Sequence, residues 1–383
     1  MQDNLKIIHI PLDLYSVFLQ PILQILLPYG GTVSQHLIES SAEIKHNFLN
    51  ISVTSIECSI ICHAPWADNI FLPFINQLSV DRDDKPLIYP ETYTAFSLCT
   101  VNMDAGQRVI DLTAPLLIAG IPVYFITTCF TDFFLICSTD RPAVISKLTE
   151  HGFSFSDSES AYVPPAYYAL CRPELSSNPL PTLVAELRDR ALKTLKERDV
   201  VPSIDQDLSL VMCSGCEAPL RRWRYSSENG PVNPKSSHAA STWLSRTNSA
   251  FYTALISALA NLPRFLSVTL ALDDVPSLLI DKKLLRLFSD SIKGDFKTVL
   301  VPISLLSKLP AEMTGLVCGV ASLLVKEICR LNAENGRKLT ELSFLSTAKV
   351  GTVILGEDQS RKSLIALLSS LDEENKQEYQ PVQ

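Results

Sequence analysis

The chain has 383 residues, of which 46% are hydrophobic and 19% are charged, and its formal net charge is −8. This composition is typical of a globular protein with two to four domains and excludes a disordered chain. The acidic balance also disfavours nucleic acid as a partner, because binding to phosphates depends on clustered Lys and Arg side chains.

Membrane and export signals are not evident in the sequence. The apolar runs are too short to cross a bilayer, and the first residues lack the charged start and cleavage site of a signal peptide. We therefore expect a protein of the cytoplasm, and also of the nucleus, that has no contact with a membrane. The ten cysteines agree with a reducing compartment, since most of them lie in apolar stretches where they act as small hydrophobic residues.

Residues 1–86 predict a first unit in which strands and helices alternate. Apolar residues recur at helical spacing after Tyr15, and the phrase Pro28-Tyr29-Gly30-Gly31 ends that helix. The expected elements are a strand at 5–14, a helix at 15–27, strands at 48–53 and 58–62, and a helix at 67–78.

Residues 87–160 show the same order more clearly. The first strand is rich in β-branched and aromatic residues, and Gly120 is placed to end the helix that follows it. Asp104 is a candidate N-cap of that helix. The expected elements are a strand at 92–102, a helix at 109–117, strands at 121–127 and 132–137, and a helix that begins near Pro142.

The remainder of the chain is predicted to hold a linker and two further units. In order, these are the linker (161–206), a third unit (207–294), a fourth unit (295–372) and a disordered tail (373–383). The linker contains a charged surface helix at 183–198. The third unit contains a polar insertion at 214–242, which we expect to be mobile.

Four phrases with two strand-length apolar runs recur along the chain, and this internal repeat decides the predicted architecture. They are FLNISVTSIECSIIC, IPVYFITTCFTDFFLIC, RFLSVTLALDDVPSLLI and LTELSFLSTAKVGTVIL. Each should form two adjacent antiparallel strands. The predicted fold class is α+β, with tandem ferredoxin-like βαββαβ domains in four copies that form two pseudo-symmetric halves.

The stretch DAGQRVIDLTAPLLIAGIPVYFITTCFTDFFLI, within 92–151, resembles an ACT domain, a small-molecule-binding βαββαβ module. Its sequence most resembles the CASTOR-type proteins, a family of cytosolic amino-acid sensors built from tandem ACT domains. This chain would be a divergent member of that family. The resemblance implies a non-enzymatic, amino-acid-binding regulatory protein that acts in nutrient signalling through the TOR pathway. It also implies a protein complex of that pathway as partner, and it allows a homodimer.

The resemblance implies a ligand site between the second and fourth units. The second unit would contribute Pro122 and Val123, together with the loop that holds Asp104 and Gly106. That loop could offer a carboxylate to a ligand ammonium and helix N–H groups to a ligand carboxylate. An equal alternative is that Asp104 only caps the helix and binds no ligand. The fourth unit would contribute two short segments. One consists of Gly315, Leu316 and Val317, and the other is the turn from Thr347 to Gly351.

Two positions depart from the family pattern. The family's arginine sensor has an aspartate where this chain has Gly351, and a buried guanidinium without a counter-charge is costly. We therefore expect a neutral or apolar amino acid, unless another acid such as Glu312 reaches in. Asp132 matches a family position at the surface that meets the partner complex, whereas Phe130 beside it does not match.

Two other functions compete with the sensor hypothesis. One is an interaction scaffold of the same fold that has no ligand. The other is metal or redox chemistry at the CxxC pair Cys213 and Cys216, for which the nearest further ligand is His238. The sequence contains no catalytic or nucleotide-binding motif, so we expect no enzymatic activity and no cofactor.

Overall fold

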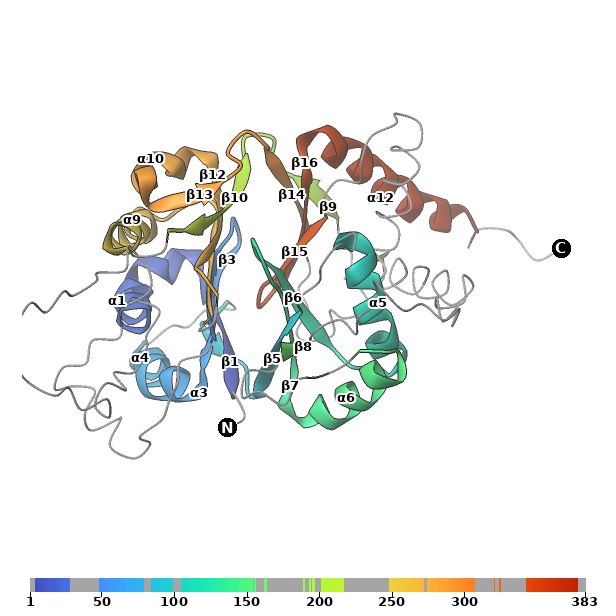
Figure 1. Ribbon diagram of the computed structural model, residues 1–383, viewed down its shortest axis with the longest axis horizontal. Coiled ribbons are helices and arrows are strands. Elements are labelled where there is room, and N and C mark those ends of the chain that lie inside the picture. Colours follow the sequence, from blue (N-terminus) through green and yellow to red (C-terminus); the bar gives the residue numbers. More distant parts are fainter. Residues whose placement is uncertain are drawn as a thin grey trace, which may run out of the picture.

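The structure is a computed structural model. It describes residues 4–27, 48–78, 84–98, 105–153, 155, 162–163, 189, 193, 195–196, 201–216, 248–271, 274–306, 320, 324 and 342–377. Figure 1 shows two β-sheets that lie face to face, with helices along the outer side of each.

The described strands run through two half-sheets. The first contains, in spatial order, β13 (Ile292–Gly294), β10 (Leu210–Gly215), β12 (Ser277–Asp281), β11 (Leu266–Ala271), β2 (Phe48–Val53), β3 (Glu57–His63) and β1 (Leu5–Pro11), with β4 (Leu87–Ile88) beside β1. The second contains β5 (Tyr93–Leu98), β7 (Asp132–Cys137), β6 (Val123–Thr127), β15 (Ser343–Ser346), β16 (Val350–Gly356), β14 (Leu300–Leu306) and β9 (Pro202–Ile204), with β8 (Tyr162–Val163) beside β5.

The two half-sheets join at both ends. Leu5 of β1 pairs with Tyr93 of β5, and Leu210 of β10 pairs with Leu300 of β14. The strands from β10 round to β14 therefore form one closed ring of twelve antiparallel strands, while β13, β9, β4 and β8 lie beside it. Closure satisfies backbone N–H and C=O groups that an open sheet would leave unpaired at its edges.

Helices lie outside the ring (Figure 1). The first half-sheet is flanked by α1 (Tyr15–Leu26), α3 (Ala64–Trp66), α4 (Leu72–Gln77), α9 (Ser249–Ala260) and α10 (Leu285–Phe288). The second is flanked by α5 (Ala105–Ile118), α6 (Arg141–Glu150) and α12 (Glu357–Gln377). Short 3-10 or π turns are η1 (Leu12–Leu14), η2 (Ala67–Phe71), η3 (Ser138–Asp140), η4 (Lys282–Leu284) and η5 (Ser289–Ser291).

Alternation along the strands divides the interior into three cores. On β7, Phe134 and Ile136 face the helices of the second half-sheet, whereas Phe133 and Leu135 face the inside of the ring. A separate core fills the space between the first half-sheet and its helices. Most strands are therefore apolar on both faces, as expected for sheets that are covered on both sides. The exceptions include β2 and β11, which bury a hydrogen-bonded polar group of Asn50, Ser52, Ser267 and Thr269.

All four repeated phrases form antiparallel hairpins, as predicted. The pairs are β2–β3, β6–β7, β11–β12 and β15–β16. The predicted end of helix α5 is also confirmed, because the helix ends at Ile118 and Gly120, two residues later, has a left-handed φ of +72. The strand expected at 5–14 ends at Pro11, and residues 12–14 form a 3-10 turn. In the third unit, residues 282–291 form three short turns, and Asp281 caps the first of them by accepting from Lys283 N (3.0 Å).

The predicted fold class is wrong. Tandem ferredoxin-like domains of α+β type would each have their own sheet with free edges. Instead, six residue pairs join β2 to β11, β6 meets β15, and the strands continue into one closed antiparallel ring that has few helices. The physical reason is that each hairpin leaves an unpaired edge strand, and another hairpin satisfies it.

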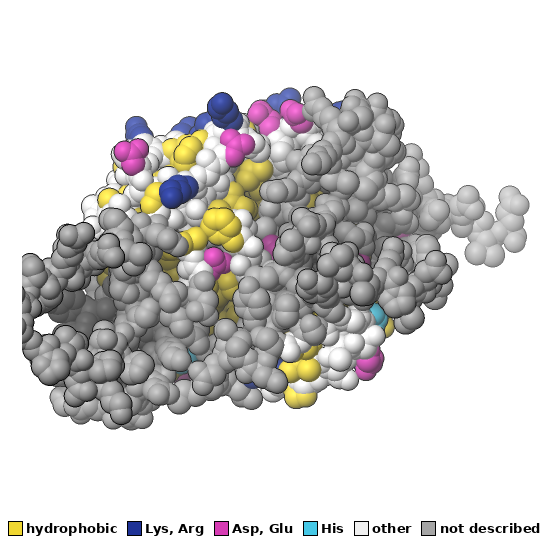
Figure 2. All heavy atoms as spheres, viewed as in Figure 1, with side chains coloured by type: hydrophobic (Ala, Val, Ile, Leu, Met, Phe, Trp, Pro, Cys, Tyr) yellow, Lys and Arg dark blue, Asp and Glu magenta, His cyan; other side chains and the backbone are white. Residues whose placement is uncertain are grey.

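Charged side chains of both signs lie close to one another on the surface. Figure 2 shows basic and acidic side chains side by side along the upper edge of the face in view. Within the part of the chain that the structure describes, no helix is both long enough and apolar enough to cross a membrane.

Phe134 tests the core of the second half-sheet. Its ring is fully buried and stacks on Phe96 with centroids 5.0 Å apart and planes at 9°. Phe134→Ala should lower the free energy of unfolding by about 3–5 kcal/mol, because it removes buried contacts and leaves a cavity. Phe130, four residues earlier and 62% exposed, is the matched control: Phe130→Ala should change stability by no more than about 0.5 kcal/mol. Urea denaturation measures both, and equal losses would contradict the assignment of this core.

Candidate functional site

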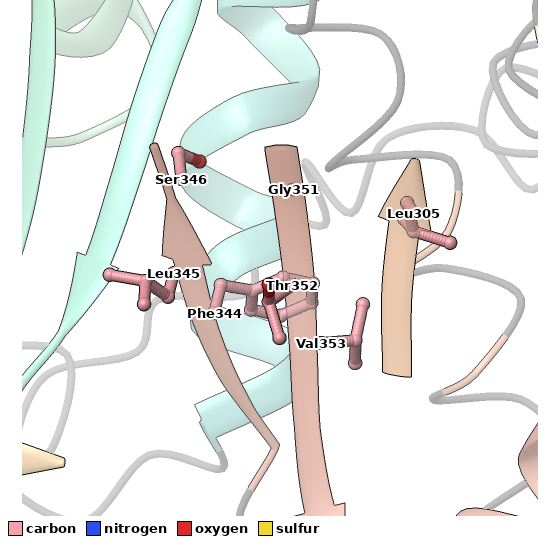
Figure 3. Close-up of a pocket in the computed structure, with 7 residues that line it drawn as sticks. All are labelled: Leu305, Phe344, Leu345, Ser346, Gly351, Thr352 and Val353. Carbon is pink, nitrogen blue, oxygen red and sulfur yellow. The ribbon is translucent and has the colours of Figure 1, made fainter. Parts of the chain in front are cut away.

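A small pocket lies on β14, β15 and β16, and we call it the Gly351 pocket. It is lined by Leu305, Phe344, Leu345, Ser346, Gly351, Thr352 and Val353 (Figure 3). The cavity volume is about 10 Å³, about the space of one water molecule and far below the roughly 300–1,000 Å³ of most small-molecule sites. An amino acid could enter only if the lining side chains moved.

The β15–β16 hairpin sets the geometry of the Gly351 pocket. Ser346 pairs with Gly351 at the end of the ladder, directly before the turn at 347–350. Leu305 of β14 pairs with Gly351 from the other side. Phe344 and Val353 lie two residues further from the turn, on the same face of their strands, and supply apolar surface. The lining is thus apolar or neutral, with hydroxyl groups at Ser346 and Thr352.

Side chains join the pocket to β6 where the backbone ladder is short. Only Leu345 and Ile126 pair as backbone partners among the described residues of β15 and β6. Phe125 N donates to Ser346 Oγ (3.0 Å), and Phe344 N donates to Thr127 Oγ1 (3.0 Å). Ser346 is only 1% exposed, and the surface that the hollow presents is apolar.

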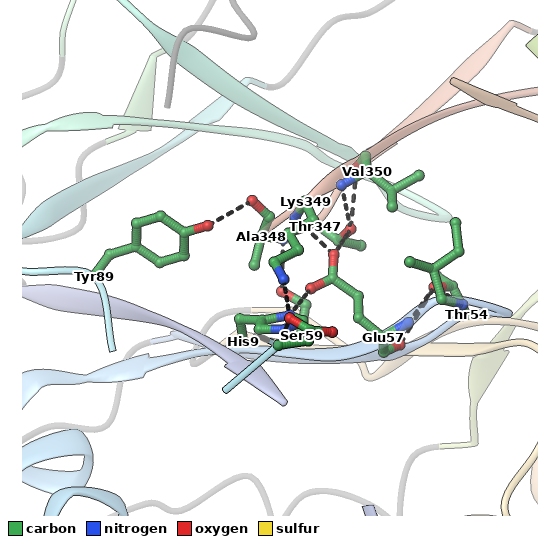
Figure 4. Close-up of polar contacts among 11 residues, drawn as sticks. His9, Thr54, Glu57, Ser59, Tyr89, Thr347, Ala348, Lys349 and Val350 are labelled. Atoms are coloured by element: carbon green, nitrogen blue, oxygen red, sulfur yellow. Dashed lines mark hydrogen bonds and ion pairs between the residues drawn. The ribbon is translucent and has the colours of Figure 1, made fainter. Parts of the chain in front are cut away.

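The turn at 347–350 crosses the inside of the ring and meets the first half-sheet (Figure 4). Glu57 Oε1 accepts from Thr347 Oγ1 (2.6 Å) and from Lys349 N (2.7 Å). Ser59 Oγ accepts from Ala348 N (3.0 Å), and Tyr89 Oη donates to Ala348 O (3.1 Å). The polar groups of the turn are therefore satisfied by strands of the opposite half-sheet.

Glu57 is fully buried, and charged groups surround it. Its Oε2 lies 2.6 Å from Nδ1 of His9, whose Nε2 lies 3.1 Å from Oδ1 of Asp84. Lys349 Nζ also contacts Asp84. The two ring nitrogens of His9 thus each face a carboxylate oxygen, which places the ring between Glu57 and Asp84. We call His9, Glu57, Ser59, Asp84 and Tyr89 the Glu57 cluster.

The charges around Asp84 change its acidity. Partial burial pushes the pKa of Asp84 up, but the hydrogen bonds from Lys349 and His9 and their positive charges outweigh burial, so the pKa is lowered. Nearby, burial raises the pKa of Tyr93 to about 12; its ring lies edge-on to Tyr124 with centroids 5.5 Å apart.

The structure brings together some of the residues predicted to bind a ligand. Gly351 lines the pocket, and Thr347 begins the turn beside it. Val123 begins β6, the strand that pairs with β15, and Pro122 precedes it. Gly106 lies in the first turn of α5. Four further predicted residues lie outside the described part of the chain, namely Asp104, Gly315, Leu316 and Val317.

The predicted partner residue and the cysteine pair have clear positions. Asp132 begins β7 and is only 5% exposed, whereas Phe130 in the same turn is exposed.

Cys213 is buried in β10, and burial raises the pKa of its thiol above the usual range. Cys216 is partly buried and donates to Asp290 O (3.3 Å). Among the described residues, no group of three or more His, Cys, Asp or Glu side chains is arranged to hold a metal ion. Most of 214–242, predicted as an insertion, lies outside the described residues, but Ser214 and Gly215 belong to β10.

Sequence reasoning missed the Glu57 cluster and Ser346. A usable signal exists at the hairpin turns, where Thr54, Thr128 and Thr347 occupy the same place. In each turn the threonine hydroxyl accepts from the backbone N–H three residues on and contacts the carbonyl of that residue. This local motif marks where each turn begins and hence which residues follow it into the ring.

Comparison with known proteins identifies one domain. Residues 88–150 match the family described as an ACT domain, so the chain contains an ACT domain over that stretch. This confirms the coarser part of the resemblance. No curated protein matches the sequence.

Two solved structures show weak similarity. An aspartate kinase from Synechocystis has 10% sequence identity and a TM-score of 0.31, with 97% of this chain and 55% of that chain covered. Protein Atu0741 from Agobacterium tumefaciens has 15% identity and a TM-score of 0.24, with 42% of this chain and 87% of that chain covered. The chain thus spans about half the length of the kinase, and similarity at these scores supports no conclusion about function.

Asp84 gives the Glu57 cluster a measurable pH dependence. A lowered folded-state pKa means that Asp84 stabilises the fold above the unfolded-state pKa near about 4, and that this contribution is lost as the pH falls through the folded-state value. Since the side chain is 55% exposed, the contribution should stay below about 1 kcal/mol. Urea denaturation of wild type and Asp84→Asn should show a stability difference at about pH 7 that shrinks by about pH 3. A difference that is constant with pH would contradict this role.

Proposed function

We propose that the protein is a non-enzymatic regulatory sensor that binds a neutral or apolar amino acid in the Gly351 pocket. The observation that carries this proposal is the position of the pocket. It is a neutral hollow whose residues Leu345 and Ser346 contact β6, and β6 belongs to the ACT domain at 88–150. ACT domains often bind amino acids for regulation.

The lining of the pocket favours an uncharged side chain in the ligand. Leu305, Phe344 and Val353 can pack against an aliphatic group, and transfer of such a group from water is favourable by about 0.8 kcal/mol per CH₂. None of the residues that line the pocket carries a charge, so a guanidinium would lose its hydration there without gaining a partner.

A ligand-free interaction scaffold is the second candidate. The observation that favours it is the small volume of the hollow, because apolar side chains already fill most of the space at the site. Neither candidate function involves a chemical step or a cofactor. Neither assigns a function to the thiols of Cys213, which is buried, and Cys216, which is partly buried.

Regulation in this proposal acts through a protein partner. The resemblance to amino-acid sensors suggests a complex of a nutrient-signalling pathway, with the TOR pathway as the named case. The contact predicted at Asp132 would use a side chain at the base of the β6–β7 turn, whose tip presents the exposed ring of Phe130. A homodimer and a location in the cytoplasm or nucleus stay predictions from the sequence.

Thermal unfolding with single amino acids tests ligand binding. Leucine and related neutral amino acids should raise Tm, because a ligand at a hundred times its Kd adds about 2.7 kcal/mol of stability. Gly351→Leu places a side chain in the hollow and should remove the rise. Lack of any shift in the wild type with every amino acid tested would favour the scaffold.

Gly351→Asp tests the charge argument. The variant should bind arginine more tightly than the wild type, by about 1.5–3 kcal/mol, since it supplies a charge-assisted partner for the guanidinium. Gly351→Asn is the matched control, because it has the same shape without the charge and should give no such gain. Calorimetric titration with arginine and leucine measures both. Tight arginine binding by the wild type that Gly351→Asp does not improve would place the site elsewhere.

A further inference from the structure

The Gly351 pocket and the Glu57 cluster share one short segment of chain. Ser346 and Gly351 face each other across the β15–β16 ladder and line the pocket. The four residues between them, 347–350, form the turn that the Glu57 cluster holds. No flexible connection separates the two, so a change in the turn must reach the pair that lines the pocket.

The turn is held by the opposite half-sheet more than by its own strands. Within the hairpin, Thr347 and Val350 exchange the local bonds of the threonine motif. The central groups of the turn, Ala348 N, Ala348 O and Lys349 N, instead bond to Ser59, Tyr89 and Glu57. These partners come from β3 and from the residue that follows β4, both in the first half-sheet.

Glu57 makes the strongest of these contacts. A buried carboxylate is stable only when it is paired and hydrogen-bonded, and this one accepts from Thr347 Oγ1, from Lys349 N and, at its second oxygen, faces His9. Removing the turn would leave the charge without two of its partners. Bonds to an ionised acceptor are also stronger than neutral ones. Glu57 therefore favours one position of the turn.

The β6–β7 turn is arranged in the same way but is held more weakly. It meets the first half-sheet at Ser277 of β12, whose Oγ accepts from Cys129 N (3.0 Å). Ser277 Oγ also donates to Cys129 Sγ (3.3 Å), so this contact consists of two neutral bonds. Of these two turns, the one beside the pocket is held by a buried charge.

We propose that Glu57 is a positioning residue for the Gly351 pocket. From the opposite half-sheet it fixes the turn at 347–350, so that occupancy of the pocket and attachment of this turn to β3 are thermodynamically linked. The inference rests on the proposed function, since it concerns the affinity of that pocket for a neutral amino acid. Linkage of this kind is reciprocal: the ligand strengthens the contact, and the contact strengthens ligand binding.

Titration of the full chain with L-leucine tests the linkage through four variants. Glu57→Ala removes the acceptor and should weaken binding about 5- to 150-fold, the usual range for coupled sites. Glu57→Gln keeps a carbonyl oxygen for Thr347 and Lys349 but removes the charge, so it should recover part of the affinity that Glu57→Ala loses. Tyr89→Phe removes only the bond to Ala348 O and should have a small effect in the same direction. Ser277→Ala, at the other turn, should leave leucine affinity unchanged.

Amide hydrogen exchange supplies a readout that a purely structural role would not move. Saturating leucine should slow exchange of the Ala348 and Lys349 amides in the wild type and in Glu57→Gln, although both amides face away from the pocket. If Glu57→Ala does not fold, Glu57→Gln and Tyr89→Phe still decide the matter through this exchange pattern.

The outcomes separate the two proposals. Absence of leucine binding by the folded wild type would overturn the proposed ligand and the linkage together. Leucine binding that is equal in wild type, Glu57→Ala and Tyr89→Phe, with no leucine-dependent protection of Lys349, would overturn the linkage and leave the pocket in place.

Discussion

A single buried carboxylate holds the two half-sheets in register at the turn beside the pocket. Glu57 is fully buried inside the ring, beside apolar side chains and hydrogen-bonded polar ones, and isolated ions are expensive in such surroundings. The partners that make it tolerable come from both half-sheets, with His9 on one side and Thr347 and Lys349 on the other. Apolar packing alone is compatible with many relative positions of the two half-sheets. Few of these positions also give the Glu57 carboxylate its hydrogen-bond partners. A polar group in a core can specify a unique arrangement in this way.

The closed ring and the buried charge depend on each other. Closure removes most free strand edges and shields the inside from water on all sides, which strengthens electrostatic contacts there. The ring joins at two places by only one backbone pair each, Leu5 with Tyr93 and Leu210 with Leu300. Contacts across the inside therefore contribute to keeping the half-sheets together where the backbone ladder is thin.

The sequence predicts the local elements of this protein well because they depend on neighbouring residues. Alternating apolar residues identify the four hairpins, and Gly120 marks the end of α5. The pairing of β2 with β11 could not be predicted, since strand-to-strand register between hairpins depends on residues far apart in the sequence. Treating each repeat as its own domain gave the wrong fold class for this reason. The ACT domain at 88–150 was recognisable because its pattern is contiguous.

The candidate site was predictable only in part, for a related reason. Thr347 and Gly351 are adjacent in the sequence to a recognisable hairpin turn, so resemblance could point to them. Glu57 follows a turn in which a charged residue would normally be solvent-exposed, and nothing near it in the sequence indicates burial. His9 sits in an apolar strand as a lone histidine. Only the fold brings these two side chains together with a turn that is almost three hundred residues away.

The architecture of the ring also constrains how the chain reaches its native state. The β2–β11 and β6–β15 seams join residues that are 217 and 221 positions apart, as between the side chains of Asn50 and Ser267 and between Phe125 N and Ser346 Oγ. Contacts of such separation form late, because the entropy of closing long loops is lost before the contacts form. During synthesis, the hairpins at 48–63 and 123–137 must wait with open edges until their partners have left the ribosome. During this interval the open strand edges can pair with other chains, so the protein is most prone to aggregation while it is being translated.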